Sequence, residues 1–225
     1  MADNYLEKKM EEHKALPDRK SFKVAKKSRA EGALPLDSLL IRNRSCRGYD
    51  SNYIVSKEEL LKIVEVNTKI ASARNQQVLR FRLVYGTEAK DVTKAIKLGG
   101  ALPELNLPLP GTDPNAYIII CTQEPKRKWV DIDLGISAQS MLLKAVDLGL
   151  NGICIAAFNK EKICALVNGS RQMEPLLILA IGKSIERFQL LPIGEDDEHN
   201  YFRKNGVHFV PKVRIEDLLI WTNQK

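Results

Sequence analysis

Hydrophobic and polar positions alternate along this chain with the periods of both strands and helices. Over residues 79–85 apolar side chains alternate with arginines, which is the period of a strand with one polar face. Residues 117–122, 152–157 and 176–181 are almost wholly apolar, as in strands buried on both faces. These four segments predict one sheet, and the helical patterns between them predict a mixed α and β chain.

Two shorter segments carry helical signals. Ser56 and Glu59 form a capping-box sequence, in which each side chain bonds the backbone N–H of the other residue. A helix is therefore expected over residues 56–67. Its apolar residues are expected to face the core: Leu60, Leu61, Ile63 and Val64. A further helix is expected to run to about Leu98, with Thr87 as its cap.

The longest helix is predicted over residues 131–149. Its apolar residues recur at helical spacing, and Gly149 stands where many helices end in the left-handed conformation. Small residues at Gly135, Ser137 and Ala138 would let another helix approach closely. Asn159 is placed to cap one more helix, between the last two predicted strands.

The chain divides into a charged N-terminal segment and one larger domain. Residues 1–33 are rich in lysine and arginine and hold few large apolar side chains, which predicts a short helix followed by a mobile segment. The remaining residues, 34–225, are numerous enough to bury a substantial core. Between residues 99 and 114 four prolines exclude a helix or a central strand. That loop is either a plain surface connection or a functional one.

Composition and charge bear on the binding partners and the cellular location of the protein. The formal net charge of +7 suits an anionic partner, but aromatic residues make up only 6% of the chain and no helix carries a basic stripe with interleaved aromatics. Nucleic acid is therefore an unsupported partner. No apolar run reaches the roughly 18 residues of a membrane span, and the N-terminus is polar where a signal peptide would be apolar. A cytoplasmic protein is expected, and its four cysteines are expected to be reduced thiols.

Cysteine and histidine give no sign of a metal site or a catalytic triad. The sequence has no CxxC spacing, and His13, His199 and His208 are not spaced like metal ligands or triad members. Cys46 is interpreted as a small turn residue, because no nearby base is evident that cysteine catalysis would need. We expect no metal.

Residues 43–49, Asn-Arg-Ser-Cys-Arg-Gly-Tyr, are the strongest candidate for a binding site. Two guanidinium groups, a hydroxyl and backbone N–H groups in one turn can converge on an anion, of which phosphate is the obvious one. Each charge-assisted hydrogen bond to phosphate contributes about 1.5–3 kcal/mol, so three or four would hold a mononucleotide tightly. The alternative is a solvated basic turn without a ligand.

Four segments together resemble the FMN-dependent nitroreductase family, over nearly everything from Leu36 to Ile220. They are Asn43-Arg44-Ser45-Cys46-Arg47, Ala71-Ser72-Ala73-Arg74-Asn75-Gln76-Gln77-Val78-Leu79, Ala145-Val146-Asp147-Leu148-Gly149-Leu150 followed by Ile155-Ala156-Ala157-Phe158, and Pro211-Lys212-Val213-Arg214. The corresponding family signatures are Arg-Arg-Ser-x-Arg, Pro-Ser-x-x-Asn-x-Gln-Pro-Trp, Ala-x-x-Leu-Gly-Leu before a strand and a Phe, and Pro-Lys-x-Arg. All four occur in the family's order.

The resemblance implies an α+β fold whose central, mainly antiparallel sheet is flanked by helices, in an intertwined homodimer. FMN would lie at the subunit interface, and the apolar helix 131–149 suits such an interface. The phosphate of FMN would be held by Arg44, Ser45, Lys212 and Arg214, with Asn43 in place of the family's first arginine. Lys212 and Arg214 could instead be plain solvent-facing charges.

The resemblance also assigns residues to the rest of the flavin. Arg47 would face the pyrimidine edge, where a cation stabilises the negative charge of a reduced ring. Ser72, Asn75 and Gln77 would hydrogen-bond the ribityl chain and ring edge, although Asn75 and Gln77 could instead cap the preceding helix. The backbone of Ala156 and Ala157 would lie against the ring near N5.

The activity implied by the resemblance is ping-pong transfer of hydride from NADH or NADPH to FMN, and then reduction of a small organic acceptor such as a nitro compound or quinone. Substrate preference does not carry over, because Ala156-Ala157 stand where many classical members have Glu-Gly and Val78-Leu79 replace Pro-Trp. Two alternatives remain: a low-turnover flavin-binding carrier or regulator, and an interaction protein that acts through residues 1–33.

Overall fold

The structure, a computed structural model, describes residues 34–98, 107–125, 127–168 and 172–220. These belong to one compact unit, Leu34–Lys225. The helix and mobile segment predicted for residues 1–33 lie outside the described residues, as does most of the proline-rich loop.

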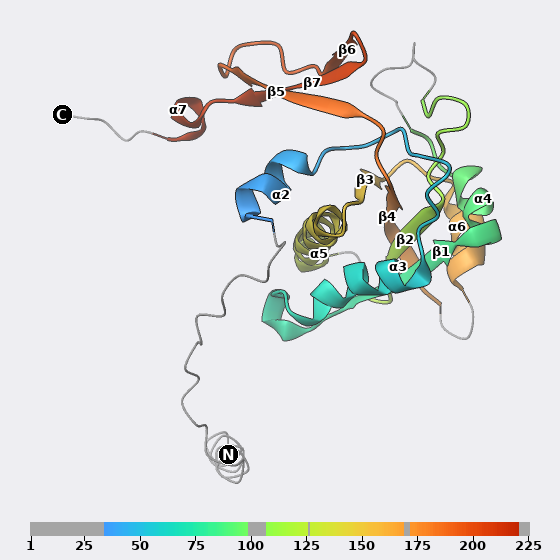
Figure 1. Ribbon diagram of the computed structural model, residues 1–225. Coiled ribbons are helices and arrows are strands. Elements are labelled where there is room, and N and C mark those ends of the chain that lie inside the picture. Colours follow the sequence, from blue (N-terminus) through green and yellow to red (C-terminus); the bar gives the residue numbers. More distant parts are fainter. Residues whose placement is uncertain (1–33, 99–106, 126, 169–171, 221–225) are drawn as a thin grey trace, which may run out of the picture. The chain divides into compact units, whose positions relative to one another are not determined.

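The centre of the unit is a four-stranded sheet in the order β1-β2-β4-β3, in which every neighbouring pair is antiparallel (Figure 1). The strands are β1 (Leu79–Tyr85), β2 (Ala116–Thr122), β3 (Asn151–Ile155) and β4 (Glu174–Gly182). All four lie where the apolar patterns predicted strands. The predicted α+β fold with a central antiparallel sheet is therefore confirmed.

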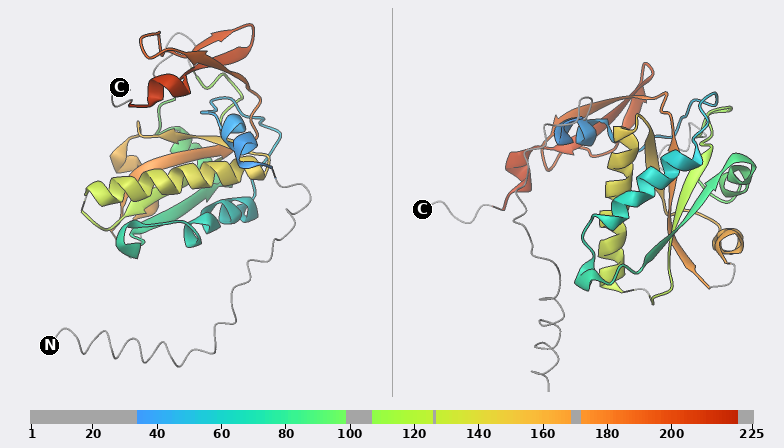
Figure 2. Two further views of the ribbon diagram at one scale, coloured as in Figure 1. Left: turned by 90° about the vertical axis from the view of Figure 1, so that its left-hand side faces the viewer. Right: turned by 60° about the horizontal axis from the view of Figure 1, so that its bottom comes forward.

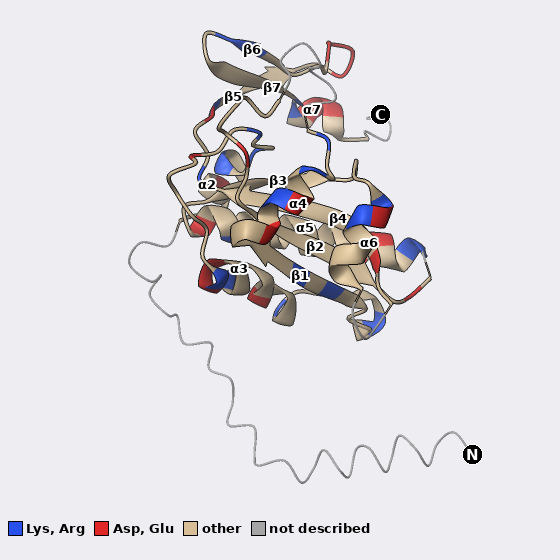
Figure 3. Cartoon of the chain, turned by 90° about the vertical axis from the view of Figure 1, so that its right-hand side faces the viewer, with Lys and Arg blue, Asp and Glu red and all other residues tan. Residues whose placement is uncertain are grey.

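Helices cover both faces of this sheet (Figure 2). One face packs against α3 (Lys57–Val64) and α5 (Lys128–Asp147), and the other against α4 (Ala89–Thr93) and α6 (Lys160–Val167). Successive residues of β2 alternate between the two cores, which is why the whole strand is buried. Correspondingly, β2 has no charged residue, whereas β1 contains basic residues (Figure 3).

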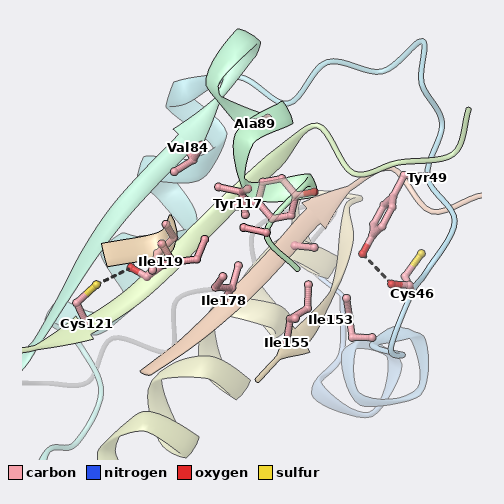
Figure 4. Close-up of a cluster of buried hydrophobic side chains, with 14 residues drawn as sticks. Cys46, Tyr49, Val84, Ala89, Tyr117, Ile119, Cys121, Ile153, Ile155 and Ile178 are labelled. Carbon is pink, nitrogen blue, oxygen red and sulfur yellow. Dashed lines mark hydrogen bonds between the residues drawn. The ribbon is translucent and has the colours of Figure 1, made fainter. Parts of the chain in front are cut away.

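The core on the α4 and α6 side is closed by an aromatic ring from the segment that follows Cys46 (Figure 4). Tyr49 is 1% exposed, and its hydroxyl donates to the backbone carbonyl of Cys46 at 2.8 Å. Its ring also lies against Gly182, where an added Cβ would come within 2.6 Å of the ring. The candidate anion-binding run is thus anchored to the core at its C-terminal end.

The predicted caps of α3, α5 and α6 are confirmed, although α3 ends at Val64 and not at Asn67, and α5 begins at Lys128 and not at Asp131. The capping box at α3 is present, with Ser56 Oγ accepting from the Glu59 N–H at 3.2 Å and Glu59 Oε2 accepting from the Ser56 N–H at 2.8 Å. Asn159 caps α6, and Gly149 follows α5 with φ of +77°. The inward position expected for Leu61 is wrong, because this side chain is 49% exposed.

The helix expected from Thr87 to about Leu98 is much shorter than predicted. A 3-10 turn, η3 (Gly86–Glu88), precedes α4, which ends at Thr93, and Thr87 caps neither element. Tertiary contacts end the helix: the Lys97 N–H donates to the Ala157 carbonyl at 2.9 Å, and Ile96 forms a β-bridge with Phe158. The chain therefore leaves the helical path to pair with the segment after β3.

A second, three-stranded sheet was missed by the prediction of one sheet. Its order is β5-β7-β6, parallel between β5 and β7 and antiparallel between β6 and β7. The strands are β5 (Arg187–Ile193), β6 (Phe202–Lys204) and β7 (Val207–Val213). Asn205 and Gly206, both at positive φ, form the Asn-Gly turn that is typical of a tight hairpin.

Two short helices were also not predicted, α2 (Leu36–Arg42) and α7 (Ile215–Leu218). Among the described helices, none is long and apolar enough to cross a membrane.

Candidate functional site

The run after α2 lies along the start of β3. Ser45 forms a parallel β-bridge with Gly152, and the Cys46 N–H donates to the Gly152 carbonyl at 3.2 Å. Asn151 fixes the same junction, since its side chain donates to the Arg42 carbonyl at 2.9 Å and accepts from the Gly152 N–H at 2.9 Å. The predicted anion-binding residues are therefore held on a strand of the central sheet.

Five of the predicted cofactor-binding residues line one cavity of about 280 Å³, here called the basic cavity: Asn43, Arg44, Ser45, Arg47 and Lys212. Residues separated by more than 160 positions in sequence thus meet where β7 passes the 43–47 run. The described lining holds three permanent cations and no Asp or Glu. Its chemistry fits an anion.

Arg44 has two roles in this arrangement. Its Nε donates to the Ile41 carbonyl at 2.9 Å and its guanidinium also bonds the Leu40 carbonyl, so the side chain satisfies carbonyls at the end of α2. Burial lowers the pKa of Arg44 from its ordinary value, but an arginine remains charged at neutral pH. Part of its hydrogen-bonding capacity is therefore used within the chain, and its charge still faces the basic cavity.

Arg47 is more deeply buried than a solvated basic turn would allow, at 8% exposed. Its guanidinium donates to the Ser45 carbonyl and to the Tyr201 hydroxyl, both at 3.1 Å, and lies 5.0 Å from the centre of the Tyr201 ring. Its backbone N–H donates to Glu186 Oε2 at 2.8 Å. No motif pointed to Tyr201, which follows a charged stretch and covers this cation.

A second group of predicted residues lies before β1, around the 3-10 turn η2 (Ala73–Asn75). Ser72 Oγ donates to Asp133 Oδ2 at 2.7 Å and accepts from the Gln77 N–H at 2.9 Å, while Gln77 Nε2 donates to Asn75 Oδ1 at 3.1 Å. These bonds hold the loop in its own conformation. The alternative in which Asn75 and Gln77 cap the preceding helix is not what the described hydrogen bonds show.

Asp133 is a site residue that the sequence analysis missed. It is 5% exposed on α5, and its second oxygen accepts from the Ala73 N–H at 2.8 Å. The signal available in the sequence was a carboxylate on the buried stripe of the long helix, since a buried carboxylate needs hydrogen-bond donors. Asp133 therefore sets the position of the Ser72 loop.

Ser72 and Gln77 line a different cavity from Arg47. This cavity of about 630 Å³, here called the apolar groove, has walls from α3, β1 and α5 that include Leu61, Leu79 and Phe81. Among the described lining residues, none is shared between the apolar groove and the basic cavity. Within one chain the two groups of predicted flavin residues do not meet.

The remaining predicted residues line neither cavity. Ala156 and Ala157 are exposed after the end of β3. Arg214 is exposed and paired with Asp217 at 3.4 Å, whereas Lys212 lines the basic cavity. Both residues are exposed, but only Lys212 borders the basic cavity, and a place for Arg214 at a phosphate stays a prediction.

Neither the Cys46 thiol nor a metal centre provides catalytic chemistry among the described residues. Burial raises the pKa of the Cys46 thiol to about 12, so it stays protonated, in keeping with a small turn residue. In the part of the chain that the structure describes, no group of His, Cys, Asp and Glu side chains could hold a metal ion. His208, however, is buried on β7 at 3% exposed.

The geometry thus defines an α+β protein that has a basic cavity beside its central sheet. The model of the nitroreductase family matches residues 111–183, from the loop before β2 to the end of β4. Bacillus subtilis (strain 168) YodC, which is named as an NAD(P)H nitroreductase, is 23% identical over 182 residues, which cover 67% of this chain and 90% of YodC. The family model and this relative both support the resemblance of the chain to the nitroreductase family.

Solved structures share the fold at low sequence identity. A point mutant of NfnB, an FMN- and NADPH-dependent nitroreductase from a Sphingopyxis strain, is 17% identical with a TM-score of 0.63, covering 85% of this chain and 100% of that one. A nitroreductase family protein of Clostridium difficile 630 is 23% identical with a TM-score of 0.54, covering 68% and 86%. At these identities the structures establish the fold.

Proposed function

We propose that this protein is an FMN-dependent oxidoreductase that takes hydride from NADH or NADPH and reduces a small organic acceptor. The observation that carries the proposal is the basic cavity, in which the Arg44, Ser45 and Lys212 side chains meet with no carboxylate among the described lining residues. Relatives named as FMN- and NAD(P)H-dependent nitroreductases add support.

The residues present fit a bound flavin mononucleotide. Ser45, Arg44 and Lys212 would hold the terminal phosphate by charge-assisted hydrogen bonds, and the buried Arg47 would present a fixed positive charge to the ring edge. FMN would supply two-electron chemistry, since it accepts hydride and passes the electrons to a second substrate. The sequence has no turn of the GxGxxG type, so a dinucleotide flavin is not expected.

A homodimer would bring the two groups of predicted flavin residues together. Within one chain, Ser72 and Gln77 line the apolar groove and not the basic cavity. Beside this groove α5 exposes an apolar stripe of Trp129, Ile132 and Ile136, at 52%, 40% and 37% exposed. Such a stripe is unfavourable in water, and a second copy of the chain would cover it.

The position of small residues on α5 corrects one expectation. Ser137 and Ala138 are 1% and 3% exposed and face the chain's own core, so neither lets a partner helix approach. Gly135 does lie on the outer face, where an added Cβ would meet no atom within 4 Å. The interface test therefore belongs at Ile136 and not at Ala138.

Ile136→Arg is expected to convert the dimer to a monomer, because a partner would have to bury an arginine without a counterion, at a cost of several kcal/mol. Analytical ultracentrifugation measures the change. The matched control is Ile54→Arg, at a 66% exposed isoleucine outside the α5 stripe, which should remain dimeric. A wild type that is monomeric with flavin still bound would refute the interface.

Arg47→Ala is expected to lower the reduction potential of bound FMN by about 30 mV or more, because about 1.4 kcal/mol of lost charge stabilisation corresponds to about 30 mV for a two-electron couple. Spectroelectrochemical titration measures the potential. Lys212→Gln should leave the potential of the flavin that does bind nearly unchanged. Equal potentials in wild type and Arg47→Ala would mean that Arg47 does not face the ring.

The enzymatic proposal is tested by NADH and NADPH oxidation with a quinone and with a nitro compound as acceptors. Steady-state rates should give the parallel double-reciprocal lines of ping-pong kinetics. Bound flavin without measurable turnover would instead favour the alternative of a flavin-binding carrier or regulator.

A further inference from the structure

Three buried side-chain nitrogens that lie close together have no hydrogen-bond partner among the described residues: Arg47 Nε, Arg203 Nε and His208 Nδ1. Buried polar atoms in folded proteins are nearly always paired, and an unpaired one needs an explanation such as a ligand or an ion. Arg47 and His208 are 8% and 3% exposed. Bulk water therefore does not satisfy these atoms.

All three residues line the same cavity of about 210 Å³, here called the second cavity. It lies between the proline-rich loop, whose Leu107 and Leu109 form one wall, and the turn between β6 and β7. Arg47 and His208 also line the basic cavity, so the two cavities share a wall. The flavin proposal uses only the basic-cavity side of that wall.

The charges around the second cavity favour an anion. Its described lining holds three arginines, Arg47, Arg187 and Arg203, against one carboxylate, Glu186. Both oxygens of that carboxylate are engaged, one by the Arg47 N–H at 2.8 Å and the other by the Arg203 guanidinium. An excess of positive charge and three unused nitrogens remain for a ligand.

We propose that the second cavity binds a small oxyanion, the carboxylate or phosphate group of a small molecule, through Arg47, Arg203 and His208. Its volume excludes a dinucleotide. Arginine offers the planar donors that carboxylate and phosphate accept. Burial and the charges of Arg203 and Arg47 lower the pKa of His208 to about 4, so at pH 7 its ring is neutral, and Nδ1 carries its proton when it faces an acceptor. The inference does not depend on FMN.

Isothermal titration calorimetry tests this site with two probes, inorganic phosphate and benzoate, at constant ionic strength in chloride. Protein saturated with FMN is used, so that the basic cavity is filled; if FMN does not bind, Lys212→Gln serves to remove anion binding there. We expect saturable binding of at least one probe, and the tighter one identifies the class of oxyanion.

His208→Phe should weaken that binding about tenfold or more, because a hydrogen bond to a charged group is lost while the ring and its contacts remain. The matched control is His199→Phe, at an exposed histidine outside the cavity, which should bind as wild type does. Arg187→Gln, at an exposed residue of the second cavity, is a second test variant and should also weaken binding. It tests the site even if His208→Phe does not fold.

Two outcomes would overturn the proposal. One is the absence of saturable binding of either probe at millimolar concentrations. The other is binding that His208→Phe and Arg187→Gln leave unchanged but that Lys212→Gln abolishes, because the anion would then occupy the basic cavity. Failure of FMN to bind would contradict the proposed function and not this site.

Discussion

Lys212→Gln is expected to weaken FMN binding by about tenfold to a hundredfold, because a charge-assisted hydrogen bond to phosphate contributes about 1.5–3 kcal/mol. Lys212 reaches the basic cavity from β7, while Ser45 and Arg44 reach it from the run after α2. Fluorescence titration of apoprotein with FMN measures the dissociation constant. The dependence of affinity on salt concentration should become shallower as well.

The control for charge alone is Lys204→Gln. Lys204 is an exposed lysine of the same sheet, on β6, and does not line the basic cavity. It should bind FMN as the wild type does. If both variants weaken FMN equally, the effect of Lys212 would be one of overall charge, and the phosphate would lie elsewhere.

Gly152→Ala is expected to destabilise the protein by about 3 kcal/mol or more, the range of severe core substitutions. An added Cβ would lie 2.4 Å from the Ala180 carbonyl and 2.8 Å from Leu142 Cδ2. Because the first of these is backbone of β4, the clash requires β3 and β4 to separate. Urea denaturation followed by circular dichroism measures the free energy of unfolding.

Gly48→Ala is the matched control in the same part of the fold. Its added Cβ would come no closer than 3.4 Å, to the Glu186 side chain, so the free energy of unfolding should change by less than about 1 kcal/mol. If Gly152→Ala is as stable as the wild type, β3 and β4 tolerate a wider spacing beside the 43–47 run. In that case a rigid sheet would not be what positions the basic cavity.

The central sheet could be predicted from sequence because β2, β3 and β4 are apolar runs and β1 alternates apolar side chains with arginines, and both patterns are local. The capping box at Ser56 and Glu59 located α3 for a similarly local reason, since both partners are within one turn. The end of α4 could not be found in this way. It depends on the pairing of Lys97 and Ile96 with Ala157 and Phe158, which lie far along the chain near the end of β3. Local helix propensity does not contain information about such a contact.

The second sheet was missed because its strands are only half buried. β5 mixes exposed and partly buried residues, and in β7 only His208 is fully buried. The two strands also contain Pro192 and Pro211, which weaken the strand pattern. The Asn205-Gly206 turn was the available signal. Arg203 and His208 lie on this second sheet, so the second cavity could not be predicted from the sequence.

For the site, sequence motifs located the residues but not their grouping. The family signatures pointed to Arg44 and Lys212, which line one cavity, and to Ser72, which lines another. A linear motif cannot say which groups share a cavity within one chain. Asp133 was missed for a related reason, because its partners Ser72 and Ala73 lie 61 and 60 residues away.

Identification of the cofactor released by the purified protein tests the central proposal most directly. The protein is reconstituted with excess FMN and FAD together, freed of unbound flavin and denatured, and the supernatant is separated by chromatography. The proposal predicts a yellow protein that releases FMN alone, in an amount close to one per chain. Release of FAD, or of no flavin from folded protein, would contradict it.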